Sequence, residues 1–276
     1  MPNLKHHLKK KLSKRELALV RNAFDIVGDI AILEIPRELN KKQKIIAEAV
    51  LNMHGNVKAV YKELGGRRGK LRLQKMQWLA GEKRTETTCR ENGIMLELDV
   101  AKAYFSPRQS TERKRIYQQV KKGEQVLVMF SGAAPYVIEI AKHSAAKAVY
   151  GIEVNRAAHK YAAANIKLNK IENKTKLFCG DVRKVMPKLK KKFDRIVMPL
   201  PKGAGSYLDL AFKYAESNGT VHFYDFLPEE DIPAASIKKI TAAAKKLGKK
   251  VRIIKAVKCG QLAPRAYRVC VDFKLG

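Results

Sequence analysis

One stretch of the sequence, from Val126 to Pro201, repeats the order strand, small-residue turn and helix. Apolar runs that alternate with helical patterns predict parallel strands joined by crossover helices, which is an α/β fold. Parallel sheets bind ligands outside the carboxyl ends of their strands. Polar or special residues stand at three predicted strand ends, namely Glu153, Asp181 and the run Met198-Pro199-Leu200-Pro201. The stretch therefore predicts a sheet that holds a nucleoside-type ligand at one edge.

The predicted sheet continues beyond this stretch. We expect strands at residues 125–130, 148–154, 176–179, 195–200, 221–226, 251–257 and 267–273, and helices at residues 135–143, 156–168, 206–215 and 235–247. Only a short turn separates the last two strands, so they should pair antiparallel. Five parallel strands and a terminal hairpin are typical of the Rossmann-like class I S-adenosylmethionine-dependent methyltransferases. We therefore predict a mostly parallel seven-stranded sheet with a terminal antiparallel hairpin.

The first hundred residues differ from the rest and predict a small α+β domain. Helical patterns cover residues 14–27 and 41–51, and glycine-punctuated polar segments follow. The basic loop of residues 65–72 suits contact with phosphate and equally suits a solvated turn. A further helix should begin near Ser110 or Thr111, either of which can cap it. We place the domains at residues 1–100 and 101–276.

The charge of the chain indicates a polyanionic partner. Lys and Arg number 57 against 26 Asp and Glu, which gives +31 at pH 7. Adaptation to an unusual cell interior is the alternative source of such an excess. No apolar run resembles a signal peptide or a membrane span, so we expect a cytoplasmic protein without membrane contact. The cysteines and histidines are scattered, and no metal site is predicted.

Each strand-end residue allows two interpretations. The turn after the first strand has one glycine, Gly132, with Ala134 where a second is usual. Glu153 lies at the position from which a carboxylate reaches ribose hydroxyls, yet it also suits a helix start. Asp181 can accept from an adenine amino group or serve as an N-cap. The two prolines of the fourth strand end form either a rigid lip over a cofactor or a simple strand terminator.

Seven segments of the sequence resemble signatures of a known group, the archaeal and eukaryotic tRNA guanine-37 N1-methyltransferases. They are Glu91-Asn92-Gly93, Asp99-Val100-Ala101-Lys102, Tyr104-Phe105-Ser106-Pro107-Arg108, Thr111-Glu112-Arg113, Asn165-Ile166-Lys167-Leu168-Asn169, Met198-Pro199-Leu200-Pro201-Lys202 and Ala263-Pro264-Arg265. The similarity runs from about Gly65 to the C-terminus. Longer members carry an N-terminal domain that binds the tRNA elbow, and we expect this chain to be a short form without it.

The resemblance implies an activity and a set of site residues. The family transfers the methyl group of S-adenosylmethionine to N1 of the guanine 3′ to the anticodon, so the implied partner is the anticodon stem-loop of tRNA, bound by a monomer. Glu112 would remove the N1 proton, Arg72 would hold guanine O6, and Tyr104 would line the pocket. Tyr104 or Tyr136 would stack on the flipped base. The implied cofactor-binding residues are Arg113, Phe130, Gly132, Glu153, Val154, Asp181, Val182, Pro199 and Pro201.

The chain departs from the family pattern at three positions, and two other functions stay open. Val128 replaces an acidic residue, Ala134 a glycine, and Pro199 an asparagine, so any guanine contact through the backbone N–H of residue 199 is lost. One alternative is the wybutosine-pathway tRNA aminocarboxypropyltransferase on the same scaffold. The other is a noncatalytic RNA-binding module on a decayed methyltransferase fold. We expect Glu112→Ala to change folding little.

Overall fold

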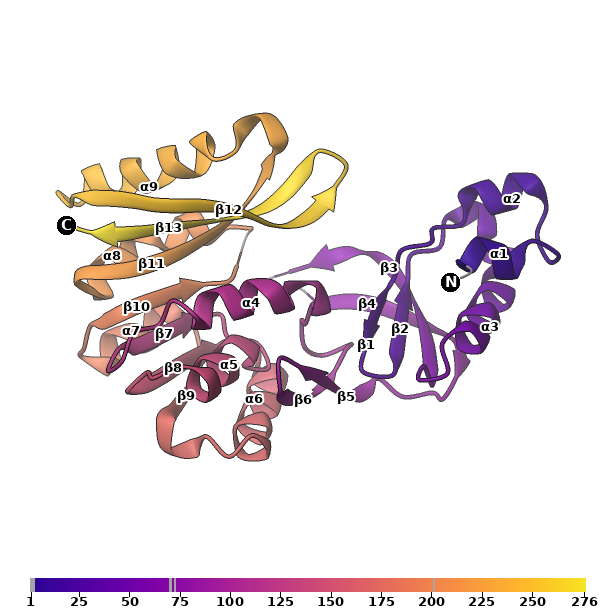
Figure 1. Ribbon diagram of the computed structural model, residues 1–276, viewed down its shortest axis with the longest axis horizontal. Coiled ribbons are helices and arrows are strands. Elements are labelled where there is room, and N and C mark those ends of the chain that lie inside the picture. Colours follow the sequence, from indigo (N-terminus) through magenta and orange to yellow (C-terminus); the bar gives the residue numbers. More distant parts are fainter. Residues whose placement is uncertain (1–2, 70, 72, 201) are drawn as a thin grey trace. The chain divides into compact units, whose positions relative to one another are not determined.

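The chain divides into two compact units, Met1–Pro107 and Arg108–Gly276, in the computed structural model (Figure 1). The structure describes residues 3–69, 71, 73–200 and 202–276. Each unit has its own hydrophobic core. Among the described residues, no helix is long and apolar enough to cross a membrane.

The first unit is a four-stranded sheet with helices on one face, which confirms the α+β prediction. Its strands follow the order β1 (Asp25–Val27), β2 (Ile30–Leu33), β3 (Ala59–Arg68) and β4 (Leu73–Gly81). Only β2 and β3 pair parallel. Helices α1 (Leu4–Leu8), α2 (Lys14–Leu19) and α3 (Gln43–Met53) contribute to its core. A separate hairpin joins β5 (Glu86–Glu91) to β6 (Ile94–Asp99).

Two predictions for this unit are wrong. The helix expected over residues 14–27 ends at Leu19, and Asp25–Val27 forms the edge strand β1. Residues 65–68 of the expected basic loop belong to β3, and Arg68 pairs with Leu73 of β4. Backbone pairing between the two strands therefore extends into the glycine-containing segment.

The second unit is a seven-stranded sheet of the predicted type. Its strands are β7 (Gln125–Met129), β8 (Ala148–Glu153), β9 (Thr175–Cys179), β10 (Phe193–Met198), β11 (Ala215–Pro228), β12 (Val251–Ala263) and β13 (Ala266–Leu275). They follow the order β12-β13-β11-β10-β7-β8-β9. The five from β11 to β9 pair parallel, and β13 pairs antiparallel with both β11 and β12. The class I methyltransferase topology is thus confirmed.

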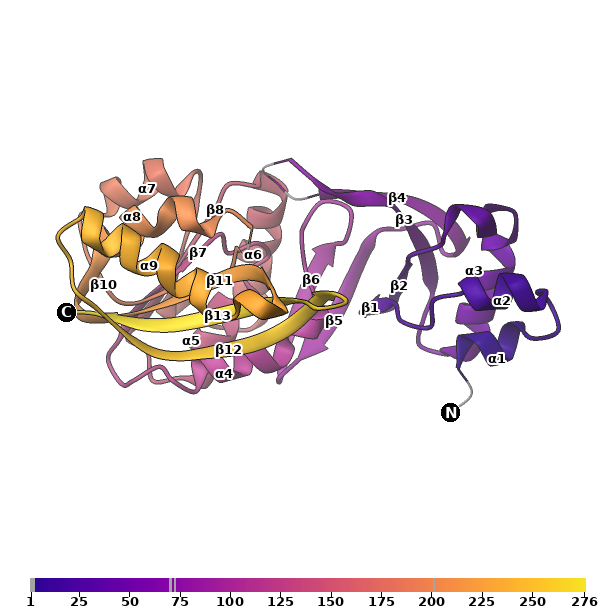
Figure 2. The same ribbon diagram turned by 90° about the horizontal axis from the view of Figure 1, so that it is seen from above.

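Helices cover both faces of this sheet (Figure 2). One face carries α4 (Ser110–Tyr117), α5 (Pro135–His143) and α6 (Arg156–Leu168), and the other carries α7 (Val182–Leu189), α8 (Leu208–Tyr214) and α9 (Ala234–Lys246). Helix α7 was not predicted, and it contains Pro187. Short 3-10 turns occupy Arg37–Lys42, Pro107–Gln109, Glu172–Lys174, Ala204–Tyr207 and Glu229–Asp231.

The start of α4 differs from the prediction. Gln109 is its N-cap residue and makes no side-chain capping bond, so neither Ser110 nor Thr111 is the cap. The 3-10 turn Pro107–Gln109 leads directly into the helix, which makes Ser110 its first residue. Glu112 consequently lies in the first turn of α4.

The two faces of the sheet have different chemistry. Along β11 and β13, side chains at alternate positions join the apolar core, among them Val221, Phe223 and Val271. The intervening His222 and Asp272 are buried and polar, and they pair directly across the two strands. Because side chains of a strand alternate between faces, the polar set lies on the face opposite that core.

The strand order places a ligand edge at the centre of the sheet. From β7 the chain moves outward through β8 to β9, and it then returns to β10 on the other side of β7. The strand order reverses at β7 and β10, which is where open α/β sheets bind ligands beyond the carboxyl ends. The residues that follow β7, β8, β9 and β10 are therefore the candidates for a cofactor site.

Candidate active site

The loop after β7 is wound tightly by alternate left-handed residues. Phe130, Gly132 and Ala134 have φ values of 58°, 58° and 71°. Ala134 is the N-cap residue of α5, so it adopts a conformation that normally favours glycine. The Phe130 ring packs edge-to-face on Tyr207, with 4.9 Å between the ring centroids. The usual second glycine is absent, yet the loop still turns as a glycine would make it turn.

Glu153 at the end of β8 holds this loop. The Gly132 amide donates to its Oε2 at 2.7 Å, and the Asn155 amide donates to its Oε1 at 2.7 Å. Burial is the largest influence on the pKa of Glu153 and raises it. The structure thus brings two of the predicted cofactor residues together, and the carboxylate orders the loop. Val154, the next residue, is half-buried.

The third strand end is joined to the second. The Gly180 amide donates to the Glu153 carbonyl at 2.8 Å. Asp181 is the N-cap of α7 and accepts from the Arg183 amide at 2.9 Å, so its capping interpretation is correct. Val182, the first residue of α7, is buried in the core of the second unit. Three successive strand ends therefore form one hydrogen-bonded edge.

The fourth strand end turns sharply at a proline. The Leu200 amide donates to the Met198 carbonyl at 2.7 Å, which leaves Pro199 half-buried at the centre of the turn. A proline fits this central position because no partner is required for a backbone N–H there. Pro201 lies outside the described residues.

Asn165 on α6 fastens the cofactor loop from behind. Its side-chain amide donates to the Ala133 carbonyl at 3.2 Å, and Asn165 is fully buried. The Asn169 side chain donates to the Asn165 carbonyl at 2.8 Å one turn later. These are the two asparagines of the family segment, and the contact with the loop gives Asn165 a role that the sequence alone did not reveal.

Glu112 on α4 is buried, and both of its carboxylate oxygens accept hydrogen bonds. Arg115 donates to both of its oxygens, from Nε to Oε2 at 2.7 Å and from Nη2 to Oε1 at 2.8 Å. The Tyr224 hydroxyl donates to Oε1 at 2.6 Å, and the Tyr136 hydroxyl donates to that of Tyr224 at 3.1 Å. These contacts argue against the expectation that Glu112→Ala changes folding little, because this variant would leave the donors Arg115 and Tyr224 without their acceptor.

The other predicted residues have distinct surroundings. Arg113 is buried, with its Nε 3.5 Å from Glu139 Oε1 and its guanidinium 5.8 Å from the centre of the Tyr136 ring. Tyr136 is itself buried. Tyr104 belongs to the first unit, where it lines a small cleft together with Phe105 and Met76. Arg72 lies outside the described residues.

A buried polar network extends from Glu112 across the sheet. Arg115 Nη1 lies 2.5 Å from Asp272 Oδ2, so one guanidinium joins two carboxylates. Asp272 Oδ1 lies 2.6 Å from His222 Nδ1, and His222 Nε2 lies 2.7 Å from Arg195 Nη1. A guanidinium only donates, so Nε2 accepts and the Nδ1–H donates to Asp272. Arg195 also forms an ion pair with Glu124, with 2.7 Å between Nε and Oε2.

The pKa values within the network follow from burial and from these bonds. Burial disfavours ionised Asp272, but hydrogen bonds from His222 and Arg115 outweigh it and lower the pKa of this carboxyl. Burial lowers the pKa of His222 and outweighs the bond to Asp272, which leaves a neutral imidazole at pH 7. Burial also disfavours the charge of Arg115, but Glu112 and Asp272 raise its pKa.

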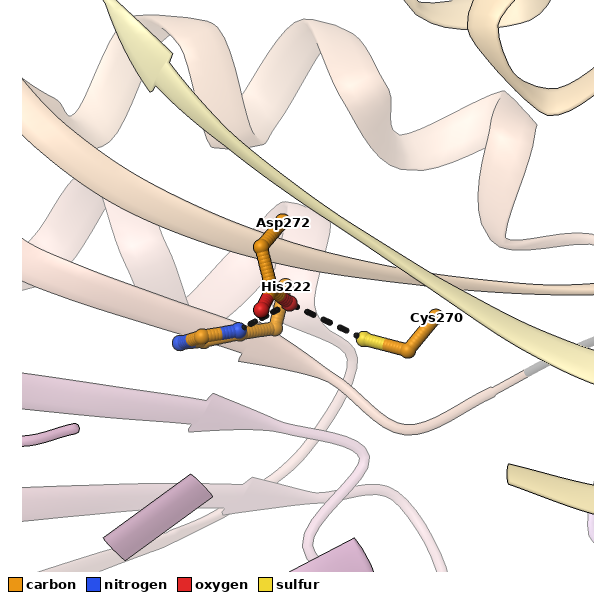
Figure 3. A group of neighbouring side chains, drawn as sticks. All are labelled: His222, Cys270 and Asp272. Atoms are coloured by element: carbon orange, nitrogen blue, oxygen red, sulfur yellow. Dashed lines mark hydrogen bonds and ion pairs between the residues drawn. The ribbon is translucent and has the colours of Figure 1, made fainter. Parts of the chain in front are cut away.

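His222, Cys270 and Asp272 have the spacing of a metal site, because their ligand atoms lie within 4.8 Å of one another (Figure 3). The Cys270 thiol donates to Asp272 Oδ1 at 3.3 Å, and both His222 nitrogens are hydrogen-bonded. The cluster stands between Arg115 and Arg195, two cations that would repel a metal ion. These three side chains are accounted for as members of the hydrogen-bonded network.

The sequence contains a signal for this network, namely polar residues within buried strands. Arg195, His222 and Asp272 are polar residues within strands of a sheet that helices cover on both faces, where apolar runs are expected. Buried charges require partners, so three such residues on neighbouring strands indicate a network. Their link to Glu112 through Arg115 depends on how α4 packs, which no local pattern reveals.

The sequence of the chain matches two protein-family models. Residues 87–254 match the TRM5/TYW2 methyltransferase domain, and residues 4–85 match the TYW2 N-terminal domain. Together these matches cover most of both units.

Three known proteins illustrate the similarity. The tRNA (guanine(37)-N(1))-methyltransferase Trm5b of Pyrococcus abyssi is 42% identical over 92% of this chain and 74% of its own length. A tRNA(Phe) (4-demethylwyosine(37)-C(7)) aminocarboxypropyltransferase of Methanocaldococcus jannaschii is 32% identical over 91% of this chain and 97% of its own length. The solved complex of aTrm5 and tRNALeu has a TM-score of 0.87 at 33% identity, and the match covers 100% of this chain and 78% of that one.

We expect Asn165→Ala to loosen the cofactor loop. Loss of the bond to the Ala133 carbonyl should speed hydrogen exchange of the Gly132 and Ala134 amides about five- to tenfold, since such a bond contributes about 1 kcal/mol. The matched control is Asn169→Ala at the C-cap of the same helix, which removes an amide that donates to the Asn165 carbonyl. Equal exchange rates in the two variants would contradict the role given to Asn165.

Proposed function

The chain belongs to the TRM5/TYW2 methyltransferase family, and we propose that it is a tRNA (guanine-37-N1)-methyltransferase that uses S-adenosylmethionine. One observation supports this activity above the others. Gly132, Glu153 and Gly180 join the strand ends into a single polar edge at the switch point of a methyltransferase sheet. We propose residues 1–100 as the RNA-side domain and residues 101–276 as the catalytic domain of a cytoplasmic monomer.

The residues at this edge suit the proposed cofactor. S-adenosylmethionine supplies an electrophilic methyl group when it is bound. Glu153 has a carboxylate that can accept from ribose hydroxyls, and Asp181 has one that can accept from an adenine amino group. Buried Glu112, its half-buried partner Arg115 and the tightly wound loop fit a site that restricts the access of water. Other residues proposed to surround the cofactor are Arg113, Phe130, Gly132, Val154, Val182, Pro199 and Pro201.

Methyl transfer to guanine N1 faces two obstacles, which Glu112 and Arg72 would address. N1 carries a proton at neutral pH, and negative charge develops on O6 when that proton leaves. Glu112 would take the proton as general base, and Arg72 would stabilise O6. A carboxylate offers about four lone-pair positions, and Arg115 and Tyr224 occupy three of those on Glu112. The remaining one on Oε2 suits the N1 proton, while Tyr104 would stack on the base.

A second activity has specific support. Residues 4–85 match the TYW2 N-terminal domain, and the aminocarboxypropyltransferase relative matches over 97% of its length. Such an enzyme would transfer the aminocarboxypropyl group of the same cofactor. Methyl transfer is favoured because the Pyrococcus abyssi methyltransferase is the more similar of the two, at 42% against 32% identity.

Nucleoside mass decides between these activities. We expect incubation of the protein with S-adenosylmethionine and unmodified tRNA bearing guanine 37 to add the mass of one methyl group to that nucleoside. A tRNA with adenine at position 37 is the control and should stay unchanged. A gain equal to an aminocarboxypropyl group would refute methyl transfer. If guanine 37 gains no mass, a tRNA that carries 4-demethylwyosine at position 37 tests the second activity. No gain on either of these two tRNAs would favour a noncatalytic RNA-binding module.

Glu112→Gln and Arg72→Ala should each slow single-turnover methyl transfer by about 10²-fold, which is the usual scale for general-base and electrostatic groups. Gln keeps an acceptor for Arg115 and Tyr224, so it separates the chemical role of Glu112 from its structural one. Arg68→Ala in the same basic segment is the control for Arg72 and should weaken tRNA binding without slowing the saturated reaction. Wild-type single-turnover rates would refute the assigned roles.

The exposed cations between α1 and α2 should contribute phosphate affinity. We expect the triple change of Lys9, Lys10 and Lys11 to alanine to weaken tRNA binding and to flatten its salt dependence, because each lost phosphate contact lowers the slope by about 0.7–0.9. All three side chains are exposed. The control removes Lys245, Lys246 and Lys249 near the end of α9. An equal effect of both triple changes would indicate nonspecific charge alone.

A further inference from the structure

Arg115 is shared between two buried carboxylates. Its Nε and Nη2 bind Glu112, while its Nη1 and Nη2 bind Asp272 at 2.5 and 3.2 Å. The side chains of Glu112 and Asp272 are 3% and 2% exposed, so water screens neither charge. One cation thus stands between two anions in a site of low dielectric constant.

The far side of Asp272 is held by a neutral group. His222 donates to Oδ1, and Arg195 fixes the imidazole from the opposite side while its own charge is matched by Glu124. Arg195 and Glu124 balance each other, so the cluster as a whole has one carboxylate in excess of its cations. Adding one proton to Glu112 would remove this excess and leave the pair Arg115–Asp272 intact.

We propose that Asp272, oriented by His222, is a positioning residue that divides the charge of Arg115 and thereby keeps Glu112 basic enough to accept the guanine N1 proton. This inference rests on the proposed function, in which Glu112 is the general base. It assigns a purpose to residues on β11 and β13 that touch neither the cofactor loop nor the described strand-end edge.

The other titratable groups that face Glu112 are neutral at working pH. Burial raises the pKa of Tyr224 on β11 and of Tyr136 on α5 well above the usual value. Burial likewise raises the pKa of Cys259 on β12 to about 12 and that of Cys270 on β13 well above its usual range. Arg113 on α4 is charged and has Glu139 as its partner. Arg115 and Asp272 are therefore the charges that set the state of Glu112.

The sign of the effect follows from this charge distribution. Asp272→Asn keeps the size of the side chain and an oxygen that can accept from His222, but it removes the second anion. Arg115 then pairs with Glu112 alone, which stabilises ionised Glu112 and makes it a weaker base. The midpoint of the acidic limb of the pH–rate profile should move to lower pH by about one unit. The plateau rate should fall about three- to tenfold, since proton transfer follows Brønsted behaviour.

The experiment measures single-turnover methyl transfer against pH for wild type, Asp272→Asn and Asp272→Glu, together with the affinities for S-adenosylmethionine and tRNA. We expect the pH midpoint to move in Asp272→Asn and to stay near that of wild type in Asp272→Glu. The affinities for S-adenosylmethionine and tRNA should be unchanged in both variants. Asp225→Asn is the matched control, since Asp225 is a buried aspartate of β11 that pairs with Lys239 at 2.6 Å and accepts from Ser236 at 3.0 Å. It should cost stability without moving the midpoint.

A second measurement is independent of activity. Carbon-13 NMR of the side-chain carboxyls gives the titration midpoint of Glu112 directly, and Asp272→Asn should lower it relative to wild type. Equal midpoints in the two proteins, or an equal shift in Asp225→Asn, would overturn the proposal. If Asp272→Asn does not fold, Asp272→Ser decides, because it also removes the charge and must lower the midpoint. Absence of any methylated guanine with wild-type protein would refute the proposed function, while the NMR comparison would still test the charge sharing.

Discussion

The guanidinium of Arg115 is the group on which the polar face of the large sheet depends. Glu112 on α4 and Asp272 on β13 are both buried, and each would be costly inside the protein without a cation beside it. Removing one partner of such a buried pair typically costs about 3–5 kcal/mol. The same contacts fasten α4 to the antiparallel end of the sheet. Since α4 also carries Arg113, its packing orients two of the residues for which a function was predicted.

The sequence predicted the second unit far better than the first. Helices α5 and α6 occur within the residues expected, because long apolar periods separated by small-residue turns are strong signals. In the first unit, cations and glycines predict a loop over residues 65–72, whereas residues 65–68 belong to β3 and Arg68 pairs with Leu73 across the hairpin. Helix α7 escaped notice because Pro187 breaks its local pattern. Contacts between distant elements outweighed local preference in both cases.

In the candidate site, too, some contacts could be predicted from the sequence and others could not. Because the carboxyl ends of neighbouring parallel strands lie at one edge of the sheet, Glu153 and Gly132 are expected close together. The structure places the Gly132 amide nitrogen 2.7 Å from Glu153 Oε2. The Arg115–Glu112 pair is a local i,i+3 contact on α4. The Tyr224 hydroxyl comes from β11, more than a hundred residues away, so the sequence alone could not indicate that contact. The departures at Ala134 and Pro199 have local explanations. Ala134 adopts the left-handed conformation of the glycine it replaces, and Pro199 stands at the centre of a tight turn.

The joined strand ends have a consequence for how a small ligand is held. Gly132, Glu153 and Gly180 are linked by backbone and carboxylate hydrogen bonds whose donors and acceptors all belong to the chain itself. The conformational entropy of these loops is therefore lost when the chain folds, and little remains to be lost on binding. Because less entropy is lost on binding, a larger part of the favourable free energy of each ligand contact contributes to affinity. The same hydrogen bonds let the loop tolerate an alanine in place of a flexible glycine.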